Sequence, residues 1–310
     1  MFALRNKLII AICLSALSMA LLPFPLCGAE SGGFGIGPGM VMVQNIKPGA
    51  GEIDASGGAG FTFEVENGTA SPQFFTLSTR TAKSTMSSWE MGYENLTELS
   101  WLRLDKTEME LAAKSKGPLK FFVNIPDKPE FYNRKWMAVV ACSPGKATKG
   151  ASSVGLIVAA RIQIETIAKD DTDGANAGDT ALIPSSWMMS DARPGDSWRK
   201  VFKIRNNTKD VHTYTLKHIE DLEPDAKKYD RYFGMEFTKI LKESWVTAGD
   251  QSFTLKPGEV KDLKLSVSVS KTAVPGKLYE ELVFLQDEKK NINFLRLRTE
   301  LLAATAAGTK

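Results

Sequence analysis

Apolar and polar residues alternate along much of the chain, in short runs that turn residues interrupt. The apolar positions 119, 121, 123 and 125 lie two residues apart, and so do 263, 265, 267 and 269. A period of two predicts half-buried strands, while Pro-Gly and Asn-Gly pairs, as at 48–49 and 67–68, predict tight turns. Strands this short, at intervals of roughly 8 to 15 residues, predict antiparallel β-sandwiches rather than alternating strands and helices.

The hydrophobic pattern occurs twice. Seven positions recur without a gap at a spacing of 144 residues: Trp101, Met109, Leu111, Leu119, Phe121, Val123 and Ile125 correspond to Trp245, Phe253, Leu255, Leu263, Leu265, Val267 and Val269. A second block, 63–67, returns as 202–206 at a spacing of 139. Two blocks in the same order indicate a tandem duplication. The sequence therefore predicts two tandem sandwiches, with Trp101 and Trp245 packed between their sheets.

Composition shifts mark the ends of the two copies. Residues 1–29 combine two basic residues, an apolar run and a small-residue cleavage site, which is the layout of a secretory signal peptide. Retention of this segment as an N-terminal anchor is the alternative. The segments that follow are a flexible lead (30–39), the first sandwich (40–167), an acidic linker (168–180), the second sandwich (181–303) and a short tail (304–310).

Charge and cysteine content narrow the function classes. The predicted signal contains two of the 39 basic residues and none of the 36 acidic ones. The mature chain is therefore close to neutral, with no general attraction for nucleic acid or for an anionic membrane. Only Cys142 remains after cleavage, which excludes an intramolecular disulfide. We expect its thiol to be buried, with pairing to a second chain as the alternative. The product is expected to be exported, to a periplasm or to the cell surface, with no membrane span after cleavage.

The motifs of common catalytic and metal sites do not occur in the sequence. His212 and His218 are the only histidines, and six residues of strand place them about 20 Å apart, too far to share a metal. The acidic run 170–174 resembles the start of a calcium loop, but Leu182 stands where the closing glutamate is needed. We expect no catalytic residue, no cofactor and no metal. Three asparagines begin glycosylation sequons, which matter only in a host with that machinery: Asn67, Asn95 and Asn206.

The turn residues of the second copy follow an order found in a known class of module. The order is Arg193-Pro194-Gly195-Asp196, the run 202–208, Trp245-Val246 and Lys256-Pro257-Gly258-Glu259. It resembles the immunoglobulin-like modules of bacterial secreted and surface proteins, such as the WxL-interacting proteins and the NPCBM-associated repeats. The resemblance covers nearly the whole mature chain and implies a fold of two immunoglobulin-like sandwiches rather than a function. The C-terminal anchor usual in WxL-interacting proteins is not found, so a wall-bound role is not carried over. The two-domain layout is also similar to that of periplasmic pilus chaperones, which capture subunits by strand addition.

These observations favour an exported, non-catalytic binding or structural protein of the cell envelope, acting through contacts with a protein or a wall polymer. The alternative is a periplasmic pilus-type chaperone that captures subunits by strand addition. A third hypothesis is a hydrolase with two carboxylates facing one cleft. Partner contacts are expected at 86–99 and 229–242, which break the strand pattern and are left open between helical turns and loops. Their aromatic side chains are the candidate partner-binding residues, unless they pack onto the sandwiches instead: Trp89, Tyr93, Tyr229, Tyr232 and Phe233.

Overall fold

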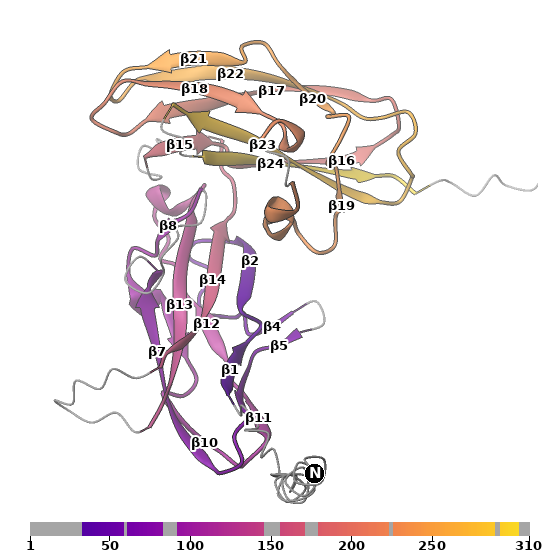
Figure 1. Cartoon of the computed structure of the whole chain (residues 1–310). Coiled ribbons are helices and arrows are strands. Elements are labelled where there is room, and N and C mark those ends of the chain that lie inside the picture. The colour runs from indigo at the N-terminus through magenta and orange to yellow at the C-terminus, as the bar shows by residue number, and fades with distance from the viewer. Residues whose placement is uncertain are drawn as a thin grey trace, which may run out of the picture.

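The computed structural model describes residues 33–58, 61–82, 92–145, 156–170, 179–222, 226–288 and 292–303. The predicted signal peptide, Trp89, most of the acidic linker and the tail lie outside these residues. Figure 1 shows two β-structured halves whose strands run at a steep angle to each other. None of the helices in the described part of the chain has the length and apolar content that a membrane crossing needs.

The first half is a sandwich built from short strands. Its elements are β1 (Phe34–Gly37), β2 (Met40–Ile46), β3 (Ile53–Asp54), β4 (Gly57–Gly58), β5 (Phe61–Thr62), β6 (Glu64–Asn67), β7 (Gln73–Thr81), β8 (Glu94–Asn95), η1 (Leu99–Trp101), β9 (Leu102–Leu104), β10 (Glu108–Leu111), β11 (Ser115–Pro118), β12 (Phe121–Val123), η2 (Pro129–Phe131), β13 (Lys135–Pro144) and β14 (Val158–Thr166). The largest sheet has the order β10-β7-β13-β14-β2, with β8 beside β13. The sheets β1-β6-β11 and β3-β12-β9 complete the sandwich.

The second half repeats this plan. Its elements are β15 (Thr180–Ile183), β16 (Ser186–Ala192), β17 (Ser197–Asn206), β18 (His212–Lys217), η3 (Ile219–Asp221), η4 (Ala226–Tyr232), β19 (Thr238–Lys239), β20 (Val246–Ala248), β21 (Ser252–Leu255), β22 (Val260–Ser268), β23 (Leu278–Asp287) and β24 (Ile292–Leu301). The larger sheet has the order β16-β24-β23-β18-β21, with β19 beside β23. The smaller one has the order β15-β17-β22-β20.

The two halves correspond element by element, as a duplication requires. β20 and β21 begin 144 residues after β9 and β10. In each half an early strand pairs in parallel with the last one, β2 with β14 and β16 with β24. Asn45 and Asp191, 146 residues apart, share a φ of 59° in these early strands. The prediction of two tandem immunoglobulin-like β-sandwiches is confirmed.

Two asparagines hold the same corner in the two halves. The Asn206 amide donates to the carbonyl oxygens of Asp210 at 2.7 Å and Leu255 at 3.1 Å, and its side-chain oxygen accepts the N–H of Thr208 at 3.0 Å. Asn67 repeats this pattern with residues 71, 111 and 69. Both side chains are fully buried. Neither can carry a glycan in the folded protein, although both begin sequons.

Asn206→Ala is expected to lower the free energy of unfolding of the second half by about 2 kcal/mol, because buried carbonyl groups lose their donor. Urea denaturation followed by tryptophan fluorescence measures the loss. Asn124→Ala, at an exposed position of the first half, should change the free energy of unfolding of its own half by less than about 0.5 kcal/mol. Equal losses in the two variants would contradict a structural role for the corner.

Each half has its own hydrophobic core. Trp245 is 8% exposed and packs in the second core against Tyr279, with ring centres 4.9 Å apart. In the first half the fully buried indole is Trp136, and Trp101 is a partly buried neighbour 5.5 Å away. The expectation of a central tryptophan therefore holds for Trp245, but Trp136 takes that place in the first half. Cys142 is buried as expected, and burial raises the pKa of its thiol to about 11.

The expectation of a flexible lead at 30–39 is wrong for residues 34–37. Residues 34–37 form β1, which pairs with β6 in the first sandwich. Ile36 is buried, and the Phe34 ring packs against Phe75 with centres 5.6 Å apart. Apolar residues at alternate positions give this glycine-rich segment one face to bury, which is enough for a strand once a neighbouring strand is available.

Candidate functional site

The two halves meet through a third hydrophobic cluster, separate from both cores. Its buried members are Ala82, Tyr93, Met137, Val139, Ile219, Leu222, Tyr229, Tyr232, Phe233, Leu282, Phe284 and Phe294. Tyr93 of the first half stacks on Tyr232 of the second, with ring centres 6.3 Å apart, and both rings lie near Phe294 at 6.2 and 5.6 Å. We call this cluster, together with the polar groups beside it, the junction.

The junction contains four of the five candidate partner-binding residues. Tyr93, Tyr229, Tyr232 and Phe233 are each at most 5% exposed, while Trp89 lies outside the described residues. The segment 229–242 contains the end of η4 and the short strand β19. These aromatic side chains therefore lie together inside the chain and not on its surface. Their role in binding a partner stays a prediction, and it would require the two halves to separate.

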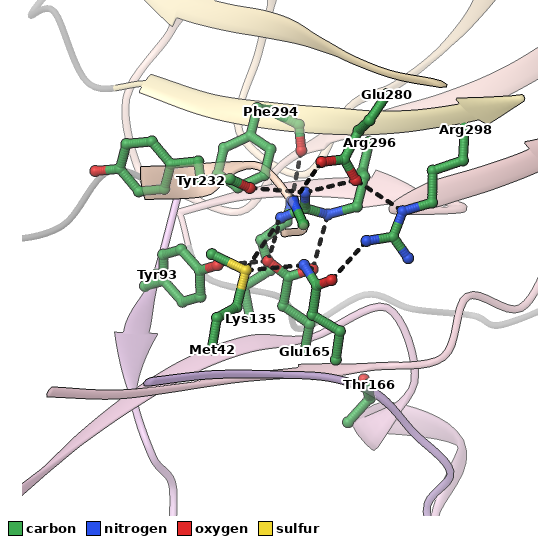
Figure 2. Close-up of polar contacts among 12 residues, drawn as sticks. Met42, Tyr93, Lys135, Glu165, Thr166, Tyr232, Glu280, Phe294, Arg296 and Arg298 are labelled. Carbon is green, nitrogen blue, oxygen red and sulfur yellow. Dashed lines mark hydrogen bonds and ion pairs between the residues drawn. The ribbon is translucent and has the colours of Figure 1, made fainter. Parts of the chain in front are cut away.

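A buried arginine lies at the centre of the junction (Figure 2). Arg296, on β24, is 1% exposed. Its Nε and Nη2 donate to the two carboxylate oxygens of Glu165, on β14 of the first half, at 3.0 and 2.7 Å. Its Nη1 lies 2.9 Å from Glu280 Oε1 and donates to the Tyr232 carbonyl at 2.7 Å. The two-point contact with Glu165 is a charge-assisted link that fixes the relative position and orientation of the two groups.

Glu280 and Arg298 extend this network along the second half. Glu280 is completely buried and accepts from Arg298 Nε and from the backbone N–H of Gly234, each at 2.7 Å. Arg298 Nη2 donates to the side-chain oxygen of Gln44, on β2, at 2.6 Å, and the Gln44 amide donates to Glu165 at 3.3 Å. Gln44 of β2 therefore links Arg298 of the second half to Glu165 of the first.

Lys135, at the start of β13, adds a third cation. Its Nζ donates to the Phe294 carbonyl and to the Asn293 side-chain oxygen at 3.3 Å, and it lies 4.2 Å from the centre of the Phe294 ring. Burial lowers the pKa of Lys135 to about 7; the charge of Glu165 opposes this shift and the charge of Arg296 adds to it. Protonated Lys135 leaves the network one positive charge in excess, and its neutral form balances the two carboxylates against the two arginines.

Glu165 stays ionised despite its burial. Burial raises the pKa of this carboxyl group, but the charge and hydrogen bonds of Arg296, aided by Lys135, bring the pKa below its ordinary value. The Tyr93 hydroxyl donates to Glu165, and burial, followed by the nearby carboxylate, raises the pKa of Tyr93 well above its ordinary value. Each of these groups has its partners inside the chain. The arrangement is therefore suited to holding the two halves together.

A histidine beside the junction provides a pH-dependent contact. His218 Nδ1 lies 3.3 Å from Glu281 Oε1, and the interaction with this carboxylate raises the pKa of His218. A pKa raised on folding stabilises the fold below the pKa of unfolded histidine, about 6.5, and that stabilisation is lost as the pH rises through the folded value. We expect an NMR titration to give His218 a pKa above that of an unfolded peptide, and Glu281→Gln to lower it. An unchanged titration in the variant would contradict the pairing.

Sequence reasoning does not select the charged residues of the junction. Arg296 lies between Leu295 and Leu297 in a strand that is otherwise mostly apolar. Arginine and glutamate are rarely buried unless they are paired, so charges within apolar strands are the signal that could have found Arg296, Glu280 and Glu165. Elsewhere in the described chain, no three histidine, cysteine, aspartate or glutamate side chains converge as a metal site would need.

No protein-family model matches the sequence, and no curated protein matches it. Solved structures with some likeness include a protein of unknown function from Porphyromonas gingivalis W83, with 11% identity over 86% of this chain and 99% of that chain and a TM-score of 0.31. The class 5 fimbriae chaperone CfaA has 12% identity over 86% and 99%, with a TM-score of 0.30. The E. coli chaperone DraB has 9% identity over 87% and 99%, with a TM-score of 0.28. TM-scores this low carry no argument about function.

Proposed function

We propose that this chain is an exported, non-catalytic protein of the cell envelope that works by binding other proteins. The observation that carries the proposal is the junction. Its arginine, Arg296, and its carboxylates, Glu165 and Glu280, are nearly closed to solvent and are used in contacts within the chain. Burying such charges costs several kcal/mol of desolvation per ion, and a network of this kind can be retained because it specifies one arrangement. Two sandwiches held at one angle offer their remaining surfaces to a partner in a defined orientation.

The state of the buried carboxylates favours binding over hydrolysis. Glu165 and Glu280 are 7% and 0% exposed, and each already accepts hydrogen bonds from arginine. A hydrolase needs one carboxyl group able to give a proton and a second one facing the same substrate. Carboxylates engaged by Arg296 and Arg298 in a closed junction are unsuited to either task.

A second candidate function is a periplasmic chaperone that captures pilus-type subunits by strand addition. The observation that favours it is the steep angle between the two halves in Figure 1, which such a two-domain chaperone would need to enclose part of a subunit. The seven-residue edge strands β2 (Met40–Ile46) and β16 (Ser186–Ala192) are available for strand addition in this reading.

Capture from an envelope extract, with cross-linking and mass spectrometry, tests the proposal. We expect the purified protein to retain a specific envelope protein and Glu165→Leu, which disturbs the junction, to retain less of it. A captured subunit that lacks one strand of its own sandwich would favour the chaperone. Turnover of an envelope polymer by the purified protein, without a retained partner, would overturn the binding proposal.

A further inference from the structure

One edge of β22 is left unpaired in the second half. β22 pairs with β17 along its whole length, but on its other side β20 covers only residues 265–267. The N–H of Gly249 donates to the Lys264 carbonyl at 3.3 Å, where that cover ends. Within the described chain, no strand lies beside residues 260–264 on this side.

The hydrogen-bond pattern shows which backbone groups this edge exposes. The backbone N–H of Asn206 donates to the Glu259 carbonyl at 3.1 Å, and the N–H of Gly258 donates to the Asn206 carbonyl at 2.7 Å. In an antiparallel ladder the residues then alternate in the direction of their backbone groups. Residues 261 and 263 therefore bond to β17, while the N–H and C=O of Val260 and Asp262 point to the open side.

A groove of about 800 Å³ runs beside this edge, between β22 and β21. Phe253 and Leu255 of β21 contribute its apolar surface, and Asp250, Lys261 and Asp262 are among its polar lining. Lys261 Nζ pairs with Asp250 at 2.8 Å and lies 5.4 Å from the centre of the Phe253 ring. The Lys261 side chain thus occupies the space between the two strands. Figure 1 shows β21 and β22 on the side of the second half that faces away from the first.

The same place in the first half is closed. Gly117 corresponds to Lys261 at the spacing of 144. A Cβ atom on Gly117 would lie 2.7 Å from Leu111 and 2.9 Å from the Met109 sulfur, so β10 packs directly on β11. A larger side chain at this position would require the Leu111 and Met109 side chains to move. The two copies therefore differ at this position: Leu111 and Met109 lie against Gly117 in the first half, and Lys261 lines the groove in the second.

The first half also protects its equivalent edge. Pro118 corresponds to Asp262 and has no N–H to offer, and Lys106 Nζ donates to the Pro118 carbonyl at 2.9 Å. Proline and lysine are common devices for preventing an edge strand from pairing with another chain. In the second half Asp262 retains its N–H, and Asp250 replaces Lys106. The second half therefore lacks both of these protecting residues at its equivalent edge.

We propose that the β22 edge at residues 260–264 binds an extended segment of a partner protein, which adds a short strand and places an apolar side chain over Phe253. This assignment rests on the proposed protein-binding function and names the edge that performs it. Unpaired backbone donors and acceptors are best satisfied by another backbone, and the neighbouring groove selects the side chains that alternate along it. Five residues of strand give the site a length of about 17 Å.

Hydrogen exchange measured by NMR tests whether the edge is open in the free protein. We expect the amides of Val260 and Asp262 to exchange at least tenfold faster than those of Lys261 and Leu263, although all four lie in one strand. Equal protection of the four amides would overturn the proposal. Faster exchange at low protein concentration than at high concentration would assign the edge to a second copy of this chain, and would overturn it too.

A phage-displayed library of nine-residue peptides identifies the segment. We expect selected peptides to carry apolar residues at alternate positions and to protect the Asp262 amide when bound. Asp262→Pro, which copies Pro118, should weaken binding at least tenfold, whereas Asp262→Ala keeps the N–H and should change it less than threefold. Near-ultraviolet circular dichroism checks that both variants fold. If Asp262→Pro does not fold, the protection of the Asp262 amide in the peptide-bound wild-type protein remains as the test.

Selection of no peptide, or of peptides that protect other amides, would overturn the assignment of this edge. The broader function is tested separately by capture from the envelope extract. An envelope partner retained equally by wild type and Asp262→Pro would leave the binding function standing and remove the β22 edge from it.

Discussion

Glu165→Leu is expected to weaken the docking of the two halves by about 3 to 5 kcal/mol. Among the described junction residues it leaves Arg296, Arg298 and Lys135 with one carboxylate, Glu280, at a site closed to water. Removing one partner of a buried ion pair costs more than the pair contributes, because the remaining charge stays buried without compensation. Each half keeps its own core. We therefore expect calorimetry to separate into two transitions and small-angle scattering to give a larger radius of gyration.

Glu300→Gln is the matched control for this variant. Glu300, on β24, pairs with Leu278 of β23 near the end of its strand, as Glu165, on β14, pairs with Lys135 of β13. Unlike Glu165, Glu300 is exposed. An exposed substitution of this kind should change stability by less than about 0.5 kcal/mol. If Glu165→Leu loses no more stability than Glu300→Gln and its melting profile is that of the wild type, the junction does not hold the halves together.

The sandwiches could be predicted because local rules and tertiary packing agree in them. Apolar residues lie two apart at positions 119, 121, 123 and 125, and Leu119, Phe121, Val123 and Ile125 are all buried in the first core. The corner asparagines repeat because only a short amide can satisfy both a backbone N–H and two carbonyl groups there. Duplication doubles this signal, since the same pattern has to fold twice.

The junction could not be predicted in the same way. A strand of a single sandwich presents every second residue to solvent, and Phe294, Arg296 and Arg298 occupy those outward positions on β24. They are buried because the other half and the segment around Tyr232 of their own half both pack against them. Where two domains meet depends on contacts distant in sequence, such as Glu165 with Arg296, and no periodicity within one strand reports such a contact. The aromatic stretch 229–233 is visible in the sequence, but its burial at the junction is not.

The difference between the two copies at β22 could be predicted only in part. The exchange of Gly117 for Lys261 and of Pro118 for Asp262 can be read by aligning the sequence with itself. Its consequence needs coordinates, because glycine and proline also occur in strands for other reasons. Only the packing of Met109 and Leu111 against Gly117 shows that this glycine closes a gap.

Lys135→Met is expected to remove a rise of stability with pH that the wild-type protein shows. The Lys135 amine has a pKa of about 7 in the folded chain and about 10.4 when unfolded. Between these values the unfolded chain binds one proton more, so the free energy of unfolding increases with pH. From pH 6 to pH 9 the contribution of this one group amounts to about 3 kcal/mol. Below the pKa of Lys135 in the folded chain this gain in stability is absent, because the folded chain then buries a charged ammonium group.

Methionine keeps most of the length of the lysine side chain and its contact with Phe294, but it carries no charge. The variant should be more stable than wild type near pH 6, and the difference should shrink towards pH 9. Urea denaturation at several pH values measures this difference, in which the titration of other groups, including His218, cancels. Lys203→Met, at an exposed position of β17, should give a difference that does not depend on pH. Parallel curves for wild type and Lys135→Met would contradict a buried, titrating Lys135.

The same reasoning connects Lys135 with Glu165. Glu165 attracts the ammonium group and partly opposes the effect of burial, so a chain that lacks this carboxylate should hold Lys135 at a still lower pKa. In Glu165→Leu the rise of stability should therefore begin at a lower pH than in wild type. The double variant Glu165→Leu with Lys135→Met should lose less stability near pH 6 than Glu165→Leu alone, because it removes one of the cations left without a partner. A double variant as unstable at pH 6 as the sum of the single changes would mean that the two groups do not interact.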